Sequence, residues 1–322
     1  MIIGGDHRLV LRLALVVASF VVLVQSHVPN TWEATTFNRM LALVQPDPIV
    51  LKYHNGSLLK GNVTVHVHWY GNFTPTHRSV IVDFIQSLSS IPHSHHSPPS
   101  VFSWWRTTAR YRGGPCTLTV GNQTLDPTYS LGKSLNTSHL RALASTQKGQ
   151  NPTKGNAIHV VLTSADVAVE GFCMSRCGTH GSGRVRNNRV VFLWVGNPAT
   201  QCPGECAWPF HQPVYGPQTP PLVPPNGDVG VDGMVISLAT VVAGAVTNPF
   251  GNGYYQGSVI APLEAVSTCT GIFGKGAYPG YTGDVLVDNV TGASYNVVGV
   301  HGRKFLLPAM WDPVTSTCKT LV

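Results

Sequence analysis

The sequence predicts one disulfide-stabilised domain of the α/β or α+β class, a mixed sheet with flanking helices. Three observations support this prediction. Segments with the period of a strand alternate along the chain with segments that have the period of a helix. No internal repeat and no linker-like segment divides the chain into smaller parts. Apolar residues make up 43% of the 322 residues, which is enough for a sizeable core.

The first element is a leader that we expect to be removed. Residues 13–24 are uncharged and mostly apolar, they follow Arg8 and Arg12, and Ser26 ends the run. This order is typical of a secretory signal peptide, and the core is too short to span a bilayer, which takes about 20 apolar residues. No later apolar run is expected to reach that length. We expect three parts: a signal peptide over 1–26, an irregular lead-in over 27–48 and a domain over 49–322.

Strand and helix patterns then alternate through the first half of the chain. Asn55-Gly56 is a hairpin turn signal. Residues 63–70 alternate apolar and polar side chains as a strand does. Thr74-Pro75 begins a helix, with Thr as N-cap and Pro in the first position. We expect the other elements of this half as follows: a helix around Trp104 and Trp105, a strand and turn over 117–131, and a helix over 138–148.

The second half contains the longest helix that the sequence predicts. Buried strands are expected over 157–163 and 190–195, a Pro-rich loop over 212–225 and a helix over 228–246. Residues 234–246 contain no charged residue and no His, so this helix is apolar nearly all round and is expected in the core. A zinc hydrolase helix needs two ligands one turn apart and a catalytic carboxylate. The sequence therefore predicts a packing role for this helix.

Charge is sparse, and its sign is positive. Charged residues are 11% of the chain and the formal net charge is +7, so the surface relies on Ser, Thr, Asn and glycan. The nearest approach to a basic patch is Arg184, Arg186 and Arg189, which either attracts a polyanion such as an acidic wall polysaccharide or only keeps a loop soluble. No nucleic-acid motif is present, and none is expected of an exported chain. Six Asn-x-Ser/Thr sequons are candidates for glycosylation: Asn55, Asn62, Asn72, Asn122, Asn136 and Asn289.

Seven cysteines in an oxidising compartment predict disulfide bonds. Cys173 and Cys177 have the same spacing as Cys202 and Cys206. We expect two bridges between these two segments, without fixing which Cys pairs with which, and a third bridge from Cys269 to Cys318. Cys116 is then the odd thiol. Structural zinc is the alternative for the four clustered cysteines, but export favours oxidation.

Residues 172–182 are the part of the chain richest in reactive side chains. A cysteine nucleophile needs a free thiolate, which the expected bridges remove. His180 and Ser182 are close in sequence, yet the Gly-x-Ser-x-Gly turn of hydrolases is absent. Asp228 and Asp232 are explained by the positive end of a helix. The sequence assigns no catalytic, cofactor-binding or metal-binding residue, and it offers one candidate functional cluster: His180, Glu205, His211, Asp228 and Asp232.

Several longer motifs point to a known family. They are Tyr-His-Asn-Gly at 53–56, Trp-Tyr-Gly-Asn-Phe at 69–73, Leu-Thr-Ser-Ala-Asp-Val at 162–167, Cys-Met-Ser-Arg-Cys-Gly-Thr-His at 173–180, Cys-Pro-Gly-Glu-Cys-Ala-Trp-Pro-Phe-His at 202–211 and Asn-Pro-Phe-Gly-Asn-Gly at 248–253. From about residue 45 to the C-terminus the chain resembles the plant EXORDIUM family, also called the phosphate-induced protein family. The resemblance implies a secreted apoplastic or cell-wall protein linked to growth, cell expansion and brassinosteroid or nutrient responses. It supplies no catalytic mechanism.

A second resemblance concerns the long helix. Residues 245–249 are similar to the stretch that follows a His-Glu-x-x-Glu motif in some secreted microbial zincins, but residues 240–244 lack the ligands and the base. We therefore expect a degenerate zincin-like scaffold.

These observations together predict a secreted, non-catalytic protein without a cofactor, which binds a cell-wall polysaccharide or an extracellular protein through exposed aromatic and basic residues. The chain is expected to have no membrane contact after cleavage of the leader. The alternative is a hydrolase or a diverged metallopeptidase that uses His180 and His211. Convergence of both histidines with a carboxylate in one cleft would favour the enzyme.

Overall fold

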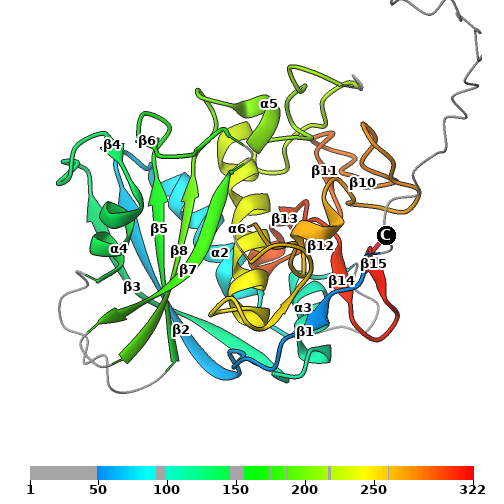
Figure 1. Cartoon of the computed structure of the whole chain (residues 1–322). Coiled ribbons are helices and arrows are strands. Elements are labelled where there is room, and N and C mark those ends of the chain that lie inside the picture. The colour runs from blue at the N-terminus through cyan, green and yellow to red at the C-terminus, as the bar shows by residue number, and fades with distance from the viewer. Residues whose placement is uncertain are drawn as a thin grey trace, which may run out of the picture. The chain divides into compact units, whose positions relative to one another are not determined.

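A mixed five-stranded sheet forms the centre of the structure, a computed structural model. It describes residues 49–91, 99–145, 156–174, 176–185, 188–216, 219–259 and 261–322. The expected signal peptide and lead-in, residues 1–48, lie outside this part. The strand order is β3-β2-β5-β8-β7 (Figure 1). The strands are β2 (Gly61–Tyr70), β3 (Cys116–Asp126), β5 (Asn156–Thr163), β7 (Gly178–Val185) and β8 (Asn188–Gly196). The first four in this order are parallel and β7 pairs antiparallel with β8 at one edge, so the predicted α/β class is confirmed.

Helices cover both faces of this sheet (Figure 1). Residues of α2 and α6 share a core with one face, and residues of α4 share a smaller core with the other. The helices are α2 (Pro75–Ser87), α3 (Val101–Trp105), α4 (Thr137–Ser145), α5 (Pro203–Cys206) and α6 (Val229–Thr247), with 3₁₀ turns η1 (Arg106–Arg110), η2 (Ser267–Cys269) and η3 (Val300–Gly302). Short strand pairs complete the fold: β1 (Lys52–Tyr53), β4 (Ser134–Leu135), β6 (Ala168–Val169), β9 (Tyr254–Tyr255), β10 (Leu286–Val287), β11 (Ser294–Tyr295), β12 (Val297–Val298), β13 (Lys304–Phe305), β14 (Met310–Asp312) and β15 (Thr317–Lys319).

The N-terminal caps and the long helix form as the sequence predicts. Thr74 accepts a hydrogen bond from the backbone N–H of His77, and Asp228 accepts one from that of Val231, at 3.1 and 2.8 Å. The helix α6 is long and apolar enough to cross a membrane, so the expectation that no later run reaches that length is wrong. Because 83% of its most apolar window is buried inside the structure, α6 serves as the core helix.

Strand β2 is buried on both faces. Val63, Val65, Val67 and Trp69 face the core around α2 and α6, as their alternation predicts. The opposite side is buried as well, because an interior strand of a parallel sheet is covered on both sides. On that side the backbone N–H of Asn122 donates to Nδ1 of His66 at 3.0 Å, and Nε2 of His68 lies 3.8 Å from a carboxylate oxygen of Asp126. Burial lowers the pKa of His66 and of His68.

The expected hairpin at Asn55-Gly56 does not form. Strand β1 pairs with β9, far along the chain, and not with β2. The backbone N–H of His54 donates to Gly253 and that of Gly56 to Asn252, both at 2.8 Å. A Cβ at Gly56 would lie within 2.3 Å of atoms of Asn252. The Asn-Gly pair therefore lets the backbone turn and approach the distant segment at residues 252–253 closely.

Three disulfide bonds confirm the cysteine prediction and resolve its open pairing. Cys173 bonds to Cys202, Cys177 to Cys206, and Cys269 to Cys318. Cys116 is free and buried, and burial raises the pKa of its thiol to about 12. The four clustered sulfurs are thus engaged with one another and not with zinc.

Candidate functional site

A cleft of about 730 Å³ lies between the edge strand β7 and the C-terminal half of α6. In Figure 1 these two elements run next to each other, with β7 in green and α6 in yellow. The turn at 248–251 and the loop that leads to η2 complete the walls. The lining mixes polar groups with apolar side chains such as Phe250, Val259 and Leu263. A concave site of this size and mixed lining is typical of a ligand-binding site.

One carboxylate is the hydrogen-bond acceptor at the centre of this cleft. His180 of β7 donates from Nε2 to Glu264, with distances of 2.9 and 2.7 Å to the two carboxylate oxygens. Asn248 donates from its side-chain amide to Oε1 of the same carboxylate, at 2.7 Å. The side chains of His180 and Glu264 are only 13% and 11% exposed. This cluster, the His180–Glu264–Asn248 network, is therefore nearly buried, and its carboxylate is satisfied by donors from two other segments.

The backbone around the network explains how three distant segments meet. Asn248 caps the end of α6, and its Oδ1 accepts from the backbone N–H of Gly253 at 2.7 Å, so its amide nitrogen must point to Glu264. A Cβ at Gly244 would lie 2.5 Å from the carboxylate and 3.0 Å from Nε2 of His180. Glycine at this helix position therefore leaves the space that the network fills.

Within the described residues, no nucleophilic side chain is hydrogen-bonded to the side chains of this network. Nδ1 of His180 is buried and has no hydrogen-bond partner among the described residues. Catalysis by an activated Ser or Cys requires a hydrogen bond between nucleophile and base. Ser182, two residues further along β7, also lines the cleft but makes no such bond in the described part. The arrangement thus offers hydrogen-bonding groups and apolar walls to a ligand.

The fold does not bring together the five residues that the sequence offers as a functional cluster. Of these five residues, His180 alone lines the cleft. Glu205 is exposed in α5, and exposed His211 lies 2.9 Å from the backbone oxygen of Gln212. Asp228 is the α6 cap and lies 3.2 Å from His77. The carboxylate that does reach His180 is Glu264, 84 residues away in sequence and in no motif, so no local pattern indicates it.

The burial of Asp232 predicts that the stability of the protein depends on pH. It accepts two hydrogen bonds from Asn226, at 2.8 and 2.7 Å, but burial in the first turn of α6 raises its pKa from 3.8 to about 7. The folded protein thus holds this proton more tightly than the unfolded chain. We expect the contribution of Asp232 to the unfolding free energy to fall as pH rises from about 4 to 7. Urea unfolding across this range should show that fall, and the variant Asp232→Asn should lose it; the same slope in both proteins would contradict the prediction.

The chain is similar in sequence to plant proteins over almost all of its length. Residues 51–321 match the family described as "Phosphate-induced protein 1 conserved region". Protein EXORDIUM-like 2 of Arabidopsis thaliana is 64% identical over 286 residues, which are 87% of this chain and 92% of that protein. Protein PHOSPHATE-INDUCED 1 of Nicotiana tabacum is 56% identical over 295 residues, which are 88% and 92%. No solved structure matches the chain.

The chain belongs to the EXORDIUM, or phosphate-induced protein 1, family. The family match includes all three residues of the cleft network and all three disulfide bonds, since both lie within residues 51–321. Protein EXORDIUM of Arabidopsis thaliana is 55% identical over 303 residues, 88% of this chain and 93% of that protein.

The zincin-like scaffold of this EXORDIUM-family chain stays a hypothesis. Thr240 and Val241 line the cleft, and Gly244 lies beneath the network, so the helix positions in question do face this site. Their side chains supply no ligand. No group of three or more His, Cys, Asp or Glu within the described ranges is placed to hold a metal ion.

Proposed function

We propose that this EXORDIUM-family protein is a secreted apoplastic protein that supports growth and cell expansion by binding at the cell wall. The bound partner is a wall polysaccharide or an extracellular protein. The protein acts in growth responses to brassinosteroid or nutrients. The observation that carries the binding role is the cleft itself. Its carboxylate, that of Glu264, accepts hydrogen bonds from both His180 and Asn248.

Two features support export to an oxidising, glycosylating route. Disulfide bonds persist outside the cytosol and are rare within it, and this fold contains three. The Asn side chain of every sequon is exposed, including Asn62 at the start of β2, so the fold leaves all six open to glycosylation: Asn55, Asn62, Asn72, Asn122, Asn136 and Asn289.

Expression in plant cells with and without residues 1–26 tests the location. We expect the full chain to reach the wall fraction and to gain mobility on gels after glycosidase treatment, and the chain without residues 1–26 to do neither. Elution from the wall fraction by rising salt then measures the ionic share of retention, because salt screens exposed charges beyond about 8–10 Å. A full chain found reduced and unglycosylated in the cytosol would overturn the proposal.

A hydrolase is the second candidate, and one observation favours it. His180 has a carboxylate on one ring nitrogen, Nε2, and an unpartnered second nitrogen, Nδ1. A general base in a hydrolytic triad also has a carboxylate on one ring nitrogen, although there the carboxylate is on Nδ1 and the nucleophile is on Nε2. His211 does not line the cleft, so the two-histidine form of this alternative has no support from the geometry. Replacement of His180 by glutamine separates the two functions, because glutamine keeps an N–H donor and cannot transfer a proton near neutral pH.

A further inference from the structure

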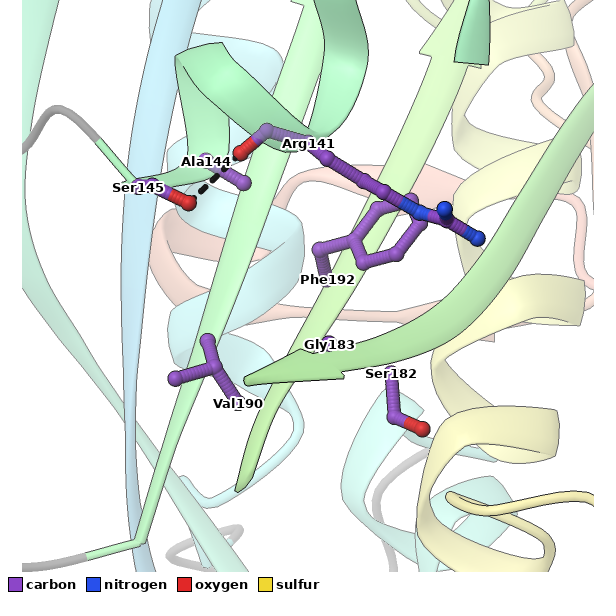
Figure 2. Close-up of a pocket in the computed structure, with 7 residues that line it drawn as sticks. All are labelled: Arg141, Ala144, Ser145, Ser182, Gly183, Val190 and Phe192. Carbon is purple, nitrogen blue, oxygen red and sulfur yellow. Dashed lines mark hydrogen bonds between the residues drawn. The ribbon is translucent and has the colours of Figure 1, made fainter. Parts of the chain in front are cut away.

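A second pocket, of about 330 Å³, lies between α4 and the β7–β8 hairpin. Figure 2 shows the side chain of Arg141 reaching from α4 over the ring of Phe192. The guanidinium carbon is 5.9 Å from the centre of that ring. The pocket is lined by Arg141, Ala144, Ser145, Ser182, Gly183, Val190 and Phe192.

The guanidinium of Arg141 is available to a ligand. Among the described residues it makes no ion pair with a carboxylate, and its cation–π contact with the ring of Phe192 is not a hydrogen bond. The hydroxyl of Ser145 donates to the backbone oxygen of Arg141 at 2.7 Å and so leaves the guanidinium untouched. A planar guanidinium presents five N–H donors in a fork that matches a carboxylate.

The lining of the pocket carries positive charge and no negative charge. Arg141 is the one charged side chain among the described residues that line it. The helix and strands that supply this lining, α4, β7 and β8, contain no Asp or Glu. A cation without a nearby carboxylate favours an anionic ligand.

The floor of the pocket is apolar, and space is open above it. Phe192 and Val190 lie side by side on the same face of β8, next to Ala144 of α4. A Cβ built on Gly183, which pairs with Val190, meets no atom within 4 Å. A small inorganic anion would leave this floor uncovered. A sugar acid has a carboxylate, hydroxyl groups and an apolar C–H face, and it matches all three features of the pocket.

We propose that this pocket binds a hexuronate unit of an acidic polysaccharide, with the carboxylate on Arg141 and the apolar face of the sugar ring on the Val190–Phe192 floor. A volume near 330 Å³ is at the lower end of small-ligand sites, which run from about 300 to 1,000 Å³, so one sugar unit is held and its neighbours extend into solvent. Ser182 lines both this pocket and the cleft beside α6, and the other six lining residues belong to this pocket alone. The inference rests on the proposed function in one respect: the acidic polysaccharide is the one that the protein meets at the cell wall.

The test measures binding of trigalacturonate to the purified, disulfide-intact protein by calorimetry at low salt. We expect Arg141→Gln to weaken binding at least tenfold. The matched control is Arg112→Gln, because Arg112 is also exposed and also lies over a ring, 5.1 Å from that of Tyr53, at another place in the fold. This control should bind as the wild type does. Equal losses in both variants would show a general charge effect and overturn the proposal.

A second variant blocks the pocket and keeps its charge. Gly183→Val places a side chain in the open space, and the backbone at Gly183 is not in the left-handed region, so the thermal midpoint should stay unchanged. We expect the same loss of trigalacturonate binding as with Arg141→Gln. Unchanged binding in this variant, equal binding of an uncharged galactose trimer, or equal affinity for inorganic phosphate would each overturn the inference. Trigalacturonate binding by a protein that is not retained in walls would count against the proposed function alone.

Discussion

Replacing Glu264 by alanine is expected to lower the free energy of unfolding by about 2–4 kcal/mol, because two nearly buried hydrogen-bond donors lose their acceptor, at roughly 1–3 kcal/mol each. The substitution removes the acceptor of the hydrogen bonds from His180 and Asn248. Both donors are then left in a nearly buried place without a partner, and an unsatisfied buried group costs more than the bond itself contributes. Urea unfolding monitored by tryptophan fluorescence measures the difference.

Two controls make this prediction specific. Glu264→Gln keeps the shape and one acceptor oxygen, so its loss should be clearly smaller. Lys133→Ala removes an ion pair with Asp166 in which the side chains are 56% and 45% exposed, and such exposed pairs contribute little to stability. A Glu264→Ala protein no less stable than Lys133→Ala would show that the network does not stabilise the fold.

Removing the Cys269–Cys318 bridge is expected to cost about 4 kcal/mol. The bridge closes a loop with a sequence separation of 49, and the entropy of the unfolded chain that a disulfide removes grows with this length. It ties strand β15 to η2. The 3₁₀ turn η2 begins three residues after Glu264, whose backbone N–H donates to the hydroxyl of Ser267 at 2.8 Å. The double variant Cys269→Ala/Cys318→Ala should therefore also loosen the cleft network.

The matched control for the bridge is Cys116→Ala. It removes a buried sulfur that forms no bridge, so only packing is lost, about 1 kcal/mol. Thermal unfolding of both proteins under oxidising conditions compares them. Equal midpoints for the double variant and for Cys116→Ala would contradict a stabilising role of the bridge.

Much of the fold follows from local patterns in the sequence. Strand β2 is predictable because its apolar residues alternate, and α2 begins where Thr74-Pro75 supplies both a cap and a fixed backbone angle. The equal spacing of the paired cysteines predicts which segments are joined. In each case the residues that determine the element lie within a few positions of one another, or in two motifs with the same spacing.

The candidate site is less predictable because its contacts are distant. Glu264 has no motif around it, and its partner His180 is 84 residues away. The pairing of β1 with β9 joins residues about 200 positions apart, so the local Asn-Gly signal suggests a wrong partner. In the sequence, Gly244 is one small residue of an apolar helix and has no sign of a special role. The structure shows that the absence of a side chain there leaves room for the network.

Growth of seedlings that lack EXORDIUM-like relatives, after they are supplied with the variant His180→Gln, tests the central claim most directly. A glutamine keeps an N–H donor for Glu264 and has no capacity for proton transfer near neutral pH. We predict that this variant restores growth as well as the wild-type protein when equal amounts reach the wall. A folded, secreted His180→Gln protein that fails to restore growth would contradict a binding role and favour catalysis at this cleft.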